Sequence, residues 1–204
     1  VNLDTYAGKY YDKVDFVSSS VEVTAGGSLT GSSANQIGIA QRSYNGAAVG
    51  NIKLTNGGTI SMTGSDSTGI AGDFATITNS AAGIITISGN KSTGIFSANG
   101  SLTKNSGTIN VNTAGTGNSA VGIYGSNNFG GSAATYGDQK INITNDGTIK
   151  YSGSAVSDGI GIYVKNNNAS KSDAVITLSG SSNIDMTGSK SGVGIFADKA
   201  LINI

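Results

Sequence analysis

Two segments of the chain, NGGTISMTGSDSTGIAG at residues 56–72 and AAGIITISGNKSTGIFS at 81–97, share one pattern of small and apolar residues. Each contains a small residue followed by x-Ile-x-apolar, and each continues after several polar residues with Gly-Ile. A pattern that returns after about 24 residues is typical of proteins built from stacked structural units. This repeat constrains the possible folds more than any other feature of the sequence.

The whole chain can be aligned on the same pattern. The first element begins at Gly27, Gly58, Gly83, Gly107, Gly147 and Ser182. The Gly-Ile element follows each copy, with its isoleucine at Ile39, Ile70, Ile95, Ile123, Ile162 and Ile195. A third short apolar segment ends each unit, with Ile52 and Leu54, Ile77, Leu102, Ile141 and Ile143, Ile176 and Leu178, and Ile202 and Ile204.

Within the first element the apolar residues lie two apart, which is the alternation of a β-strand with one buried face. Three short strands cannot bury a core alone, but stacked units can pair each strand in parallel with its counterpart. We therefore predict an all-β solenoid, a three-sided parallel β-helix, right-handed because parallel crossovers almost always are. One internal column should contain Ile60, Ile85, Ile109, Ile149 and Ile184, and a second should contain Ile70, Ile95, Ile123, Ile162 and Ile195. A stack of β-sandwiches is the competing interpretation, and the regular unit length argues against it.

Composition agrees with stacked strands. The 204 residues include 32 Gly and no Pro, and proline would remove donors from strands that pair on both sides. Glycine and asparagine are expected at tight corners because they tolerate positive φ. Asn56, Asn105 and Asn145, each two residues before a repeat glycine, are positioned for such corners.

Three segments depart from the period. Residues 1–24 contain little glycine and are interpreted as an irregular first turn or partial cap over the open end of residues 25–204. Extra residues around 112–137 and 152–174 are expected to form outward loops, because the walls of such a tube are strands. The chain begins at Val1 and ends on an apolar alternating stretch, so we interpret it as an excerpt from a longer protein.

Composition also limits the chemistry. The chain has no His and no Cys, which excludes imidazole bases, thiolate nucleophiles and structural zinc. Lys plus Arg and Asp plus Glu number 12 each, whereas a nucleic-acid binder normally has a basic face. We therefore expect no nucleic-acid partner, no catalytic residues, no cofactor and no metal. The acids are scattered, and they are interpreted as solvated surface groups: Asp66, Asp73, Asp138, Asp146, Asp158, Asp173, Asp185 and Asp198.

One surface feature is a candidate binding site. The residue after each isoleucine of the Gly-Ile element should face outward by alternation, and in four successive units it is aromatic: Phe96, Tyr124, Tyr163 and Phe196. These rings could form a contact strip for a protein or a glycan. Alternatively, the rings turn inward at a corner or are covered by the two insertions. Phe129 and Tyr136 in the first insertion are further candidates with the same alternatives.

The repeat units resemble those of type V autotransporter passengers. The resemblance is carried by NGGTIS at 56–61, NDGTIK at 145–150, STGIF at 92–96 and VGIF at 193–196, and it covers about residues 25–204. In particular, the chain is similar to the very large fusobacterial outer-membrane adhesins of the RadD-like kind. The resemblance implies a secreted passenger displayed on the cell surface and anchored in the outer membrane by a C-terminal β-barrel outside these residues. It also implies adhesion to host cells or other bacteria, and a role in virulence, without catalysis in the stalk.

The leading hypothesis is a non-catalytic, monomeric stalk segment that also offers an adhesion surface to a host-cell or bacterial surface protein or glycan. Two alternatives remain: a polysaccharide lyase or hydrolase on the same fold, and a pure spacer with no ligand. The enzyme requires at least three Asp, Lys or Arg side chains gathered in one groove beside the insertions. The spacer requires that the aromatic residues and both insertions can be replaced without loss of adhesion.

Overall fold

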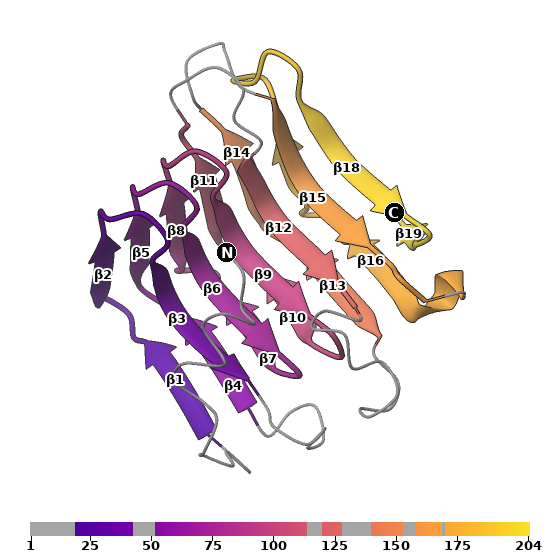
Figure 1. Cartoon of the computed structure of the whole chain (residues 1–204), viewed down its shortest axis with the longest axis horizontal. Coiled ribbons are helices and arrows are strands. Elements are labelled where there is room, and N and C mark those ends of the chain that lie inside the picture. Colours follow the sequence, from indigo (N-terminus) through magenta and orange to yellow (C-terminus); the bar gives the residue numbers. More distant parts are fainter. Residues whose placement is uncertain (1–18, 43–51, 114–119, 128–139, 153–157, 169) are drawn as a thin grey trace.

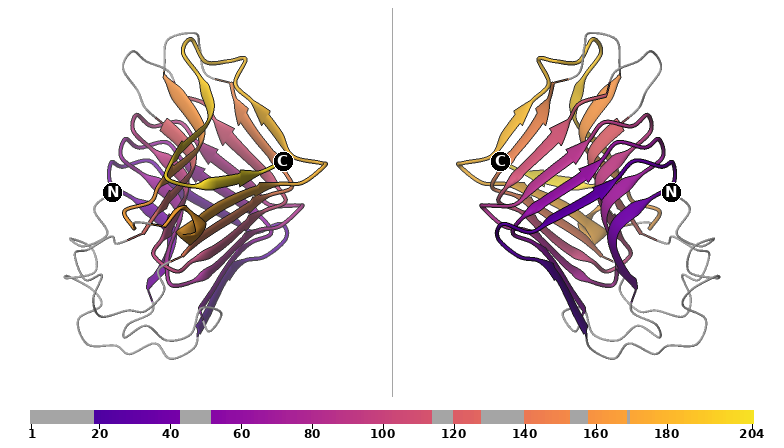
Figure 2. Two further views of the ribbon diagram at one scale, coloured as in Figure 1. Left: turned by 90° about the vertical axis from the view of Figure 1, so that its right-hand side faces the viewer. Right: turned by 90° about the vertical axis from the view of Figure 1, so that its left-hand side faces the viewer.

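The computed structural model describes residues 19–42, 52–113, 120–127, 140–152, 158–168 and 170–204. These residues form nineteen β-strands and one short 3-10 helix, η1 (Lys171–Asp173), and the strands wind around a common axis (Figure 1). Viewed toward the two ends of that axis, three sheets surround the interior (Figure 2). The predicted three-sided parallel β-helix is confirmed.

Every third strand belongs to the same sheet. Sheet A contains β1 (Ser19–Val23), β4 (Ile52–Asn56), β7 (Thr76–Asn79), β10 (Leu102–Asn105), β13 (Ile141–Asn145), β16 (Ala174–Leu178) and β19 (Leu201–Asn203). Sheet B contains β2 (Ser28–Gly31), β5 (Thr59–Met62), β8 (Ile84–Ile87), β11 (Thr108–Val111), β14 (Thr148–Tyr151) and β17 (Asn183–Asp185). Sheet C contains β3 (Ile37–Arg42), β6 (Thr68–Asp73), β9 (Thr93–Ala98), β12 (Ala120–Ser126), β15 (Gly159–Lys165) and β18 (Val193–Asp198). We call three consecutive strands, one from each sheet, a rung.

The isoleucine columns are those that the repeat predicts. In sheet B, Ile60 pairs with Ile85, Ile85 with Ile109, and the register continues through Ile149 to Ile184. In sheet C the column runs from Ile39 to Ile195 through Ile70, Ile95, Ile123 and Ile162. The isoleucines of the middle rungs have no exposed surface, so stacking buries what a single rung could not.

The third apolar segment differs from the expectation in one rung. Thr103, not Leu102, aligns with Ile77 and Ile143 in the interior column of sheet A. Leu102 faces outward, is 42% exposed and borders a shallow depression of about 240 Å³ on the outer face of this sheet. The buried hydroxyl of Thr103 has no hydrogen-bond partner among the described residues.

Positive φ, predicted for the glycines and asparagines at corners, occurs at only a few of them. Among the described glycines only Gly26 has positive φ, whereas six other residues adopt it: Asn35, Asp66, Phe74, Lys91, Asn99 and Lys199. The repeat glycines are instead required by close approach. A Cβ on Gly107 would lie 2.2 Å from the carbonyl oxygen of Gly83, well inside any tolerated contact.

Asn56, Asn105 and Asn145 are not positive-φ corner residues, so that expectation is wrong. Together with Asn79 they form a buried ladder in which each side-chain amide donates to the next Oδ1, at 2.9, 2.8 and 2.7 Å. The last member, Asn145, donates to the hydroxyl of Ser182 at 2.6 Å. The ladder satisfies polar groups that would be costly to bury alone.

The segments that depart from the period are described only in part. Ser19–Val23 of the predicted cap region forms β1, in parallel register with β4, and residues 1–18 lie outside the described residues. Within the two predicted insertions, β12 and β15 continue sheet C in register. Residues 114–119, 128–139, 153–157 and 169, which include Phe129 and Tyr136, lie outside the described residues.

The C-terminal end of the stack is more open than the middle. Ile184 and Ile195 are only partly buried there, and Ile202 in β19 is 44% exposed although its partner Ile176 is fully buried. The strands β17, β18 and β19 each pair with one neighbour among the described strands.

Candidate contact surface

The four aromatic residues form one column on the outer face of sheet C. The strand register pairs Phe96 with Tyr124, Tyr124 with Tyr163, and Tyr163 with Phe196. The column continues toward the N-terminal end with Ala71 and Ala40. The sequence therefore predicts this register correctly, residue by residue.

The column faces outward because of the glycine that precedes each isoleucine. In the register of sheet C, Val121 aligns with Thr93 and Ile123 with Ile95, whereas Gly94 and Gly122 between them are not paired. A Cβ on Gly94 would lie 2.8 Å from Cγ2 of Ile109 in sheet B and 2.6 Å from the carbonyl oxygen of Gly122. The glycine therefore lies against the core, the isoleucine that follows is also buried, and the next side chain points away.

The rings contact one another along the axis. The centroids of Phe96 and Tyr124 lie 5.1 Å apart with the planes tilted by 53°. Tyr124 and Tyr163 are stacked, with centroids 5.0 Å apart and planes at 10°. Tyr163 and Phe196 meet edge to face, at 5.3 Å and 65°. These separations fall in the favourable range for aromatic pairs, each of which contributes about 0.5–1.5 kcal/mol beyond area burial.

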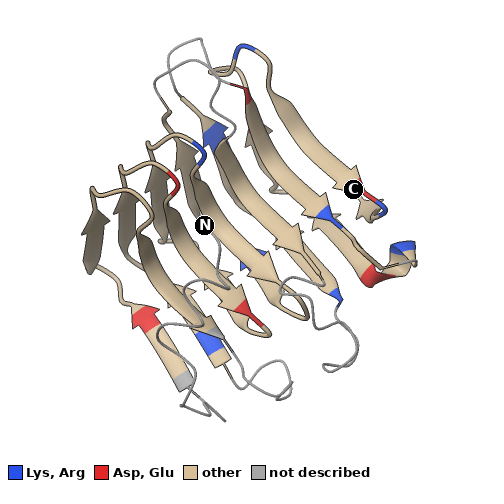
Figure 3. Cartoon of the chain, in the orientation of Figure 1, with Lys and Arg blue, Asp and Glu red and all other residues tan. Residues whose placement is uncertain are grey.

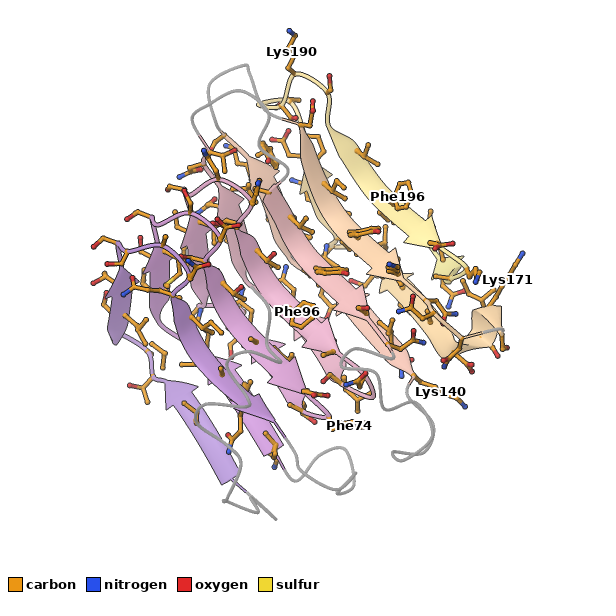
Figure 4. All side chains as sticks on the ribbon, in the orientation of Figure 1. Phe74, Phe96, Lys140, Lys171, Lys190 and Phe196 are labelled. Atoms are coloured by element: carbon orange, nitrogen blue, oxygen red, sulfur yellow. The ribbon has the colours of Figure 1, made fainter. Side chains whose placement is uncertain are left out.

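Exposure increases along the column. Phe96 is buried, with 6% of its surface exposed, and packs with Ala71 and Ala98. Tyr124 and Tyr163 are half-buried, and Phe196 is 48% exposed. Figure 4 shows Phe96 and Phe196 on the same outward face. Tyr124 and Tyr163, whose strands have a neighbour on each side, are therefore the accessible rings in the body of the sheet.

A second apolar column lies beside the aromatic one. Val121 pairs with Ile160, and Ile160 with Val193. Val121 is 8% exposed, Ile160 is half-buried and Val193 is 41% exposed. This column is not among the predicted contact residues, although its signal is present in the sequence: VGIY, IGIY and VGIF at 121–124, 160–163 and 193–196 repeat a branched residue before the glycine. The two columns together form the apolar strip of sheet C: Val121, Tyr124, Ile160, Tyr163, Val193 and Phe196.

The environment of Tyr124 perturbs its phenol. Burial, and to a smaller extent the neighbouring Tyr163, raises the pKa of Tyr124, although a hydrogen bond with the Ser126 side chain opposes this change. The phenol therefore stays neutral over a wider pH range than an exposed tyrosine.

In sheet C the charged residues Asp73, Lys165 and Asp198 are each the last residue of their strand, and the front strands are uncharged along most of their length (Figure 3). Lys104 Nζ and Asp146 Oδ2 form an ion pair at 2.8 Å, and the hydrogen bond from Lys104 lowers the pKa of Asp146. Asp185 accepts hydrogen bonds from the hydroxyl and the amide of Thr187, at 2.6 and 3.0 Å, and these lower the pKa of Asp185. Asp73 accepts a hydrogen bond of 2.6 Å from the Asn99 amide. These three carboxylates thus have local structural partners.

Within the described residues, no three His, Cys, Asp or Glu side chains come together as potential metal ligands. The same residues contain no helix with the length and apolar character needed to span a membrane.

No protein family was found to match this chain, and no curated protein or solved structure matches it either.

Proposed function

We propose that this chain is a non-catalytic segment of a surface-displayed autotransporter passenger, and that it serves both as a stalk and as an adhesion surface. The observation that carries the adhesive part is the apolar strip of sheet C. Ile160 and Tyr163 are half-buried although their strand, β15, has a neighbour on each side, so part of each side chain is open to solvent in the body of the sheet, and Val193 and Phe196 continue the strip on β18. A contiguous exposed apolar surface of this kind is typical of interaction sites.

The architecture supports the role of a stalk. Parallel columns and the asparagine ladder connect successive rungs through the interior, so the body is continuous over its length. Each rung extends a parallel β-helix by about 4.8 Å. Stiffness follows from the buried columns, since no rung can move without exposing the isoleucines of its neighbours.

The ring geometry favours a protein partner. Tyr124 and Tyr163 are stacked, so each covers one face of the other and turns mainly ring edges outward. Sugar rings bind aromatic side chains through an open ring face, whereas apolar protein side chains pack against edges and faces alike. The partner that this strip suits best is an apolar patch on a protein of a host or bacterial cell surface.

An adhesion assay with matched variants tests the proposal. Beads coated with the chain are exposed to host epithelial cells and to bacteria, beside beads carrying the double variant Tyr163→Ser and Phe196→Ser. Phe96 stays unchanged because it is buried and its loss would disturb packing. The control is the double variant Ile84→Ser and Leu102→Ser, which removes side chains 40% and 42% exposed on sheets B and A.

All three proteins are first compared by circular dichroism and thermal melting. The proposal expects adhesion by the parent and the control, and its loss in the sheet C variant. Equal adhesion by all three proteins would show that the strip is not the contact surface. Failure of the parent to adhere to either cell type would leave the role of spacer.

A further inference from the structure

Tyr124 and Tyr163 occupy equivalent positions on the adjacent strands β12 and β15. Their ring centroids lie 5.0 Å apart with the planes only 10° from parallel. Both side chains are half-buried, so each ring has a solvent-accessible edge as well as a covered face. Two phenols held together at the surface in this way are a reactive pair, because tyrosyl radicals couple through the carbon atoms ortho to the hydroxyl.

We propose that Tyr124 and Tyr163 form an intramolecular dityrosine cross-link under one-electron oxidation, which joins two rungs covalently. The oxidant is the high-valent haem of a peroxidase supplied with hydrogen peroxide. Each phenol loses one electron and one proton to give a phenoxyl radical. The two radicals combine through their ortho carbons, and each ring then transfers its ortho hydrogen to its oxygen and becomes a phenol again. One hydrogen peroxide accepts two electrons and two protons and becomes two waters.

The geometry brings the pair close to the product. The ring centroids of a biphenyl lie slightly closer than the 5.0 Å found here, so a small approach and a rotation from stacked to edge-joined rings suffice. Such rotation is accessible because the ring torsion of tyrosine is soft. The register of β12 and β15 holds the two backbones side by side throughout, so coupling needs no movement of the strands.

The neighbours of the pair direct the coupling. Phe96 and Phe196 lie at the outer ends of the stack, with ring centroids 5.1 and 5.3 Å from Tyr124 and Tyr163. Because phenylalanine has no phenol, it cannot form the same radical, and each tyrosine of the stack has the other as its phenolic neighbour in the column. The hydrogen bond with the Ser126 side chain favours loss of the Tyr124 phenolic proton, and this proton passes to the solvent at the exposed edge.

The test treats the chain with a plant haem peroxidase and a limiting amount of hydrogen peroxide. The expected product has the electrophoretic mobility of a monomer, emits the blue fluorescence of dityrosine and has lost two hydrogen atoms in mass. After proteolysis, mass spectrometry should identify one cross-linked species that joins the peptides containing Tyr124 and Tyr163. The cross-linked protein should also melt at a higher temperature than the untreated protein.

The variants Tyr124→Phe and Tyr163→Phe keep the aromatic column and remove one phenol each, and each should abolish this species. The variant Tyr151→Phe serves as control, because Tyr151 is a buried core residue with 1% exposure; it should leave the species in place. Oxidation in concentrated urea should remove the preference for this pair, because the register no longer holds the rings together.

Three results would overturn the proposal: no cross-link although the peroxidase oxidises free tyrosine, a cross-link confined to other tyrosines or to dimers, or a species joining the same peptides that survives Tyr163→Phe. The readouts are covalent and do not involve adhesion, so their outcome is independent of the proposed function.

Discussion

The side-chain amide of Asn79 donates a hydrogen bond of 2.8 Å to Oδ1 of Asn105, inside the body and from one rung to the next. Asn105 in turn donates to Asn145 at 2.7 Å, so it is both acceptor and donor in the ladder. Beyond the two ends of the ladder, Val23 and Leu178 occupy the equivalent positions in the same column. An apolar residue therefore fits this position where it has no asparagine to bind on both sides.

Asn105→Leu should therefore destabilise the protein for electrostatic reasons more than for steric ones. It removes the acceptor for Asn79 and the donor for Asn145, and each orphaned buried group costs about 1–3 kcal/mol. The midpoint of urea unfolding should fall accordingly. Asn110→Leu, on the outward side of β11, is the control and should change the midpoint little; equal effects would contradict the ladder's role.

Gly94→Ala should be strongly destabilising. Its Cβ would lie 2.6 Å from the carbonyl oxygen of Gly122 and 2.8 Å from Cγ2 of Ile109, and neither the sheet backbone nor a fully buried isoleucine can move freely. We expect a loss of about 1–3 kcal/mol or more, as for overpacked cores. Gly180→Ala meets no atom within 4 Å and should stay within about 0.5 kcal/mol of the parent. Thermal melting of the two variants measures the contrast, and similar melting points would refute the close-approach explanation.

Thr103→Val should stabilise the protein. The hydroxyl of Thr103 is buried without a hydrogen-bond partner among the described residues, and an isosteric valine removes it from an interior column of Ile77 and Ile143. The expected gain is about 1–3 kcal/mol, the usual cost of an unpaired buried hydroxyl. Thr78→Val, on the outward side of β7, provides the comparison in chemical denaturation. A decrease in stability at Thr103 would show that its hydroxyl is satisfied in solution.

Alkaline titration should distinguish Tyr124 from an exposed tyrosine. Its pKa is raised, chiefly by burial, so the folded state holds the phenolic proton more tightly than the unfolded state. The stabilisation linked to this proton is therefore complete below the ordinary tyrosine pKa of about 10 and is lost as the pH rises through the folded-state pKa. The difference in ultraviolet absorbance between the parent and Tyr124→Phe should show one phenol ionising above pH 10. Ionisation at or below that value would contradict the effect of burial.

The sequence predicts most of this fold because the repeat gives the register directly. Two aligned copies determine which residues pair, and the alternation determines which face is buried, so the columns through Ile109 and Ile123 follow without any structure. The same reasoning places the aromatic column on the outer face of sheet C.

Other features could not be read from the pattern. Leu102 faces outward and Thr103 faces inward, which is the reverse of what the apolar pattern predicts. The reason is that the register of a parallel sheet is set by the whole strand and not by one residue. The sequence does not distinguish asparagines of a buried hydrogen-bonded ladder from asparagines at corners with positive φ, because asparagine is favourable in both places. The different exposed fractions of Phe96 and Phe196 depend on which residues surround each ring in three dimensions, and the sequence repeat does not specify those neighbours.

The stacked columns also determine how the molecule would unfold. Each interior strand pairs only with the strand before it and the strand after it in its sheet, so opening one rung uncovers the buried isoleucines of the two adjacent rungs. Unfolding should then spread from rung to rung, as in other one-dimensional arrays. A protease that cuts an opened rung would leave folded pieces of the body, whereas a compact globule under the same attack is lost as a whole.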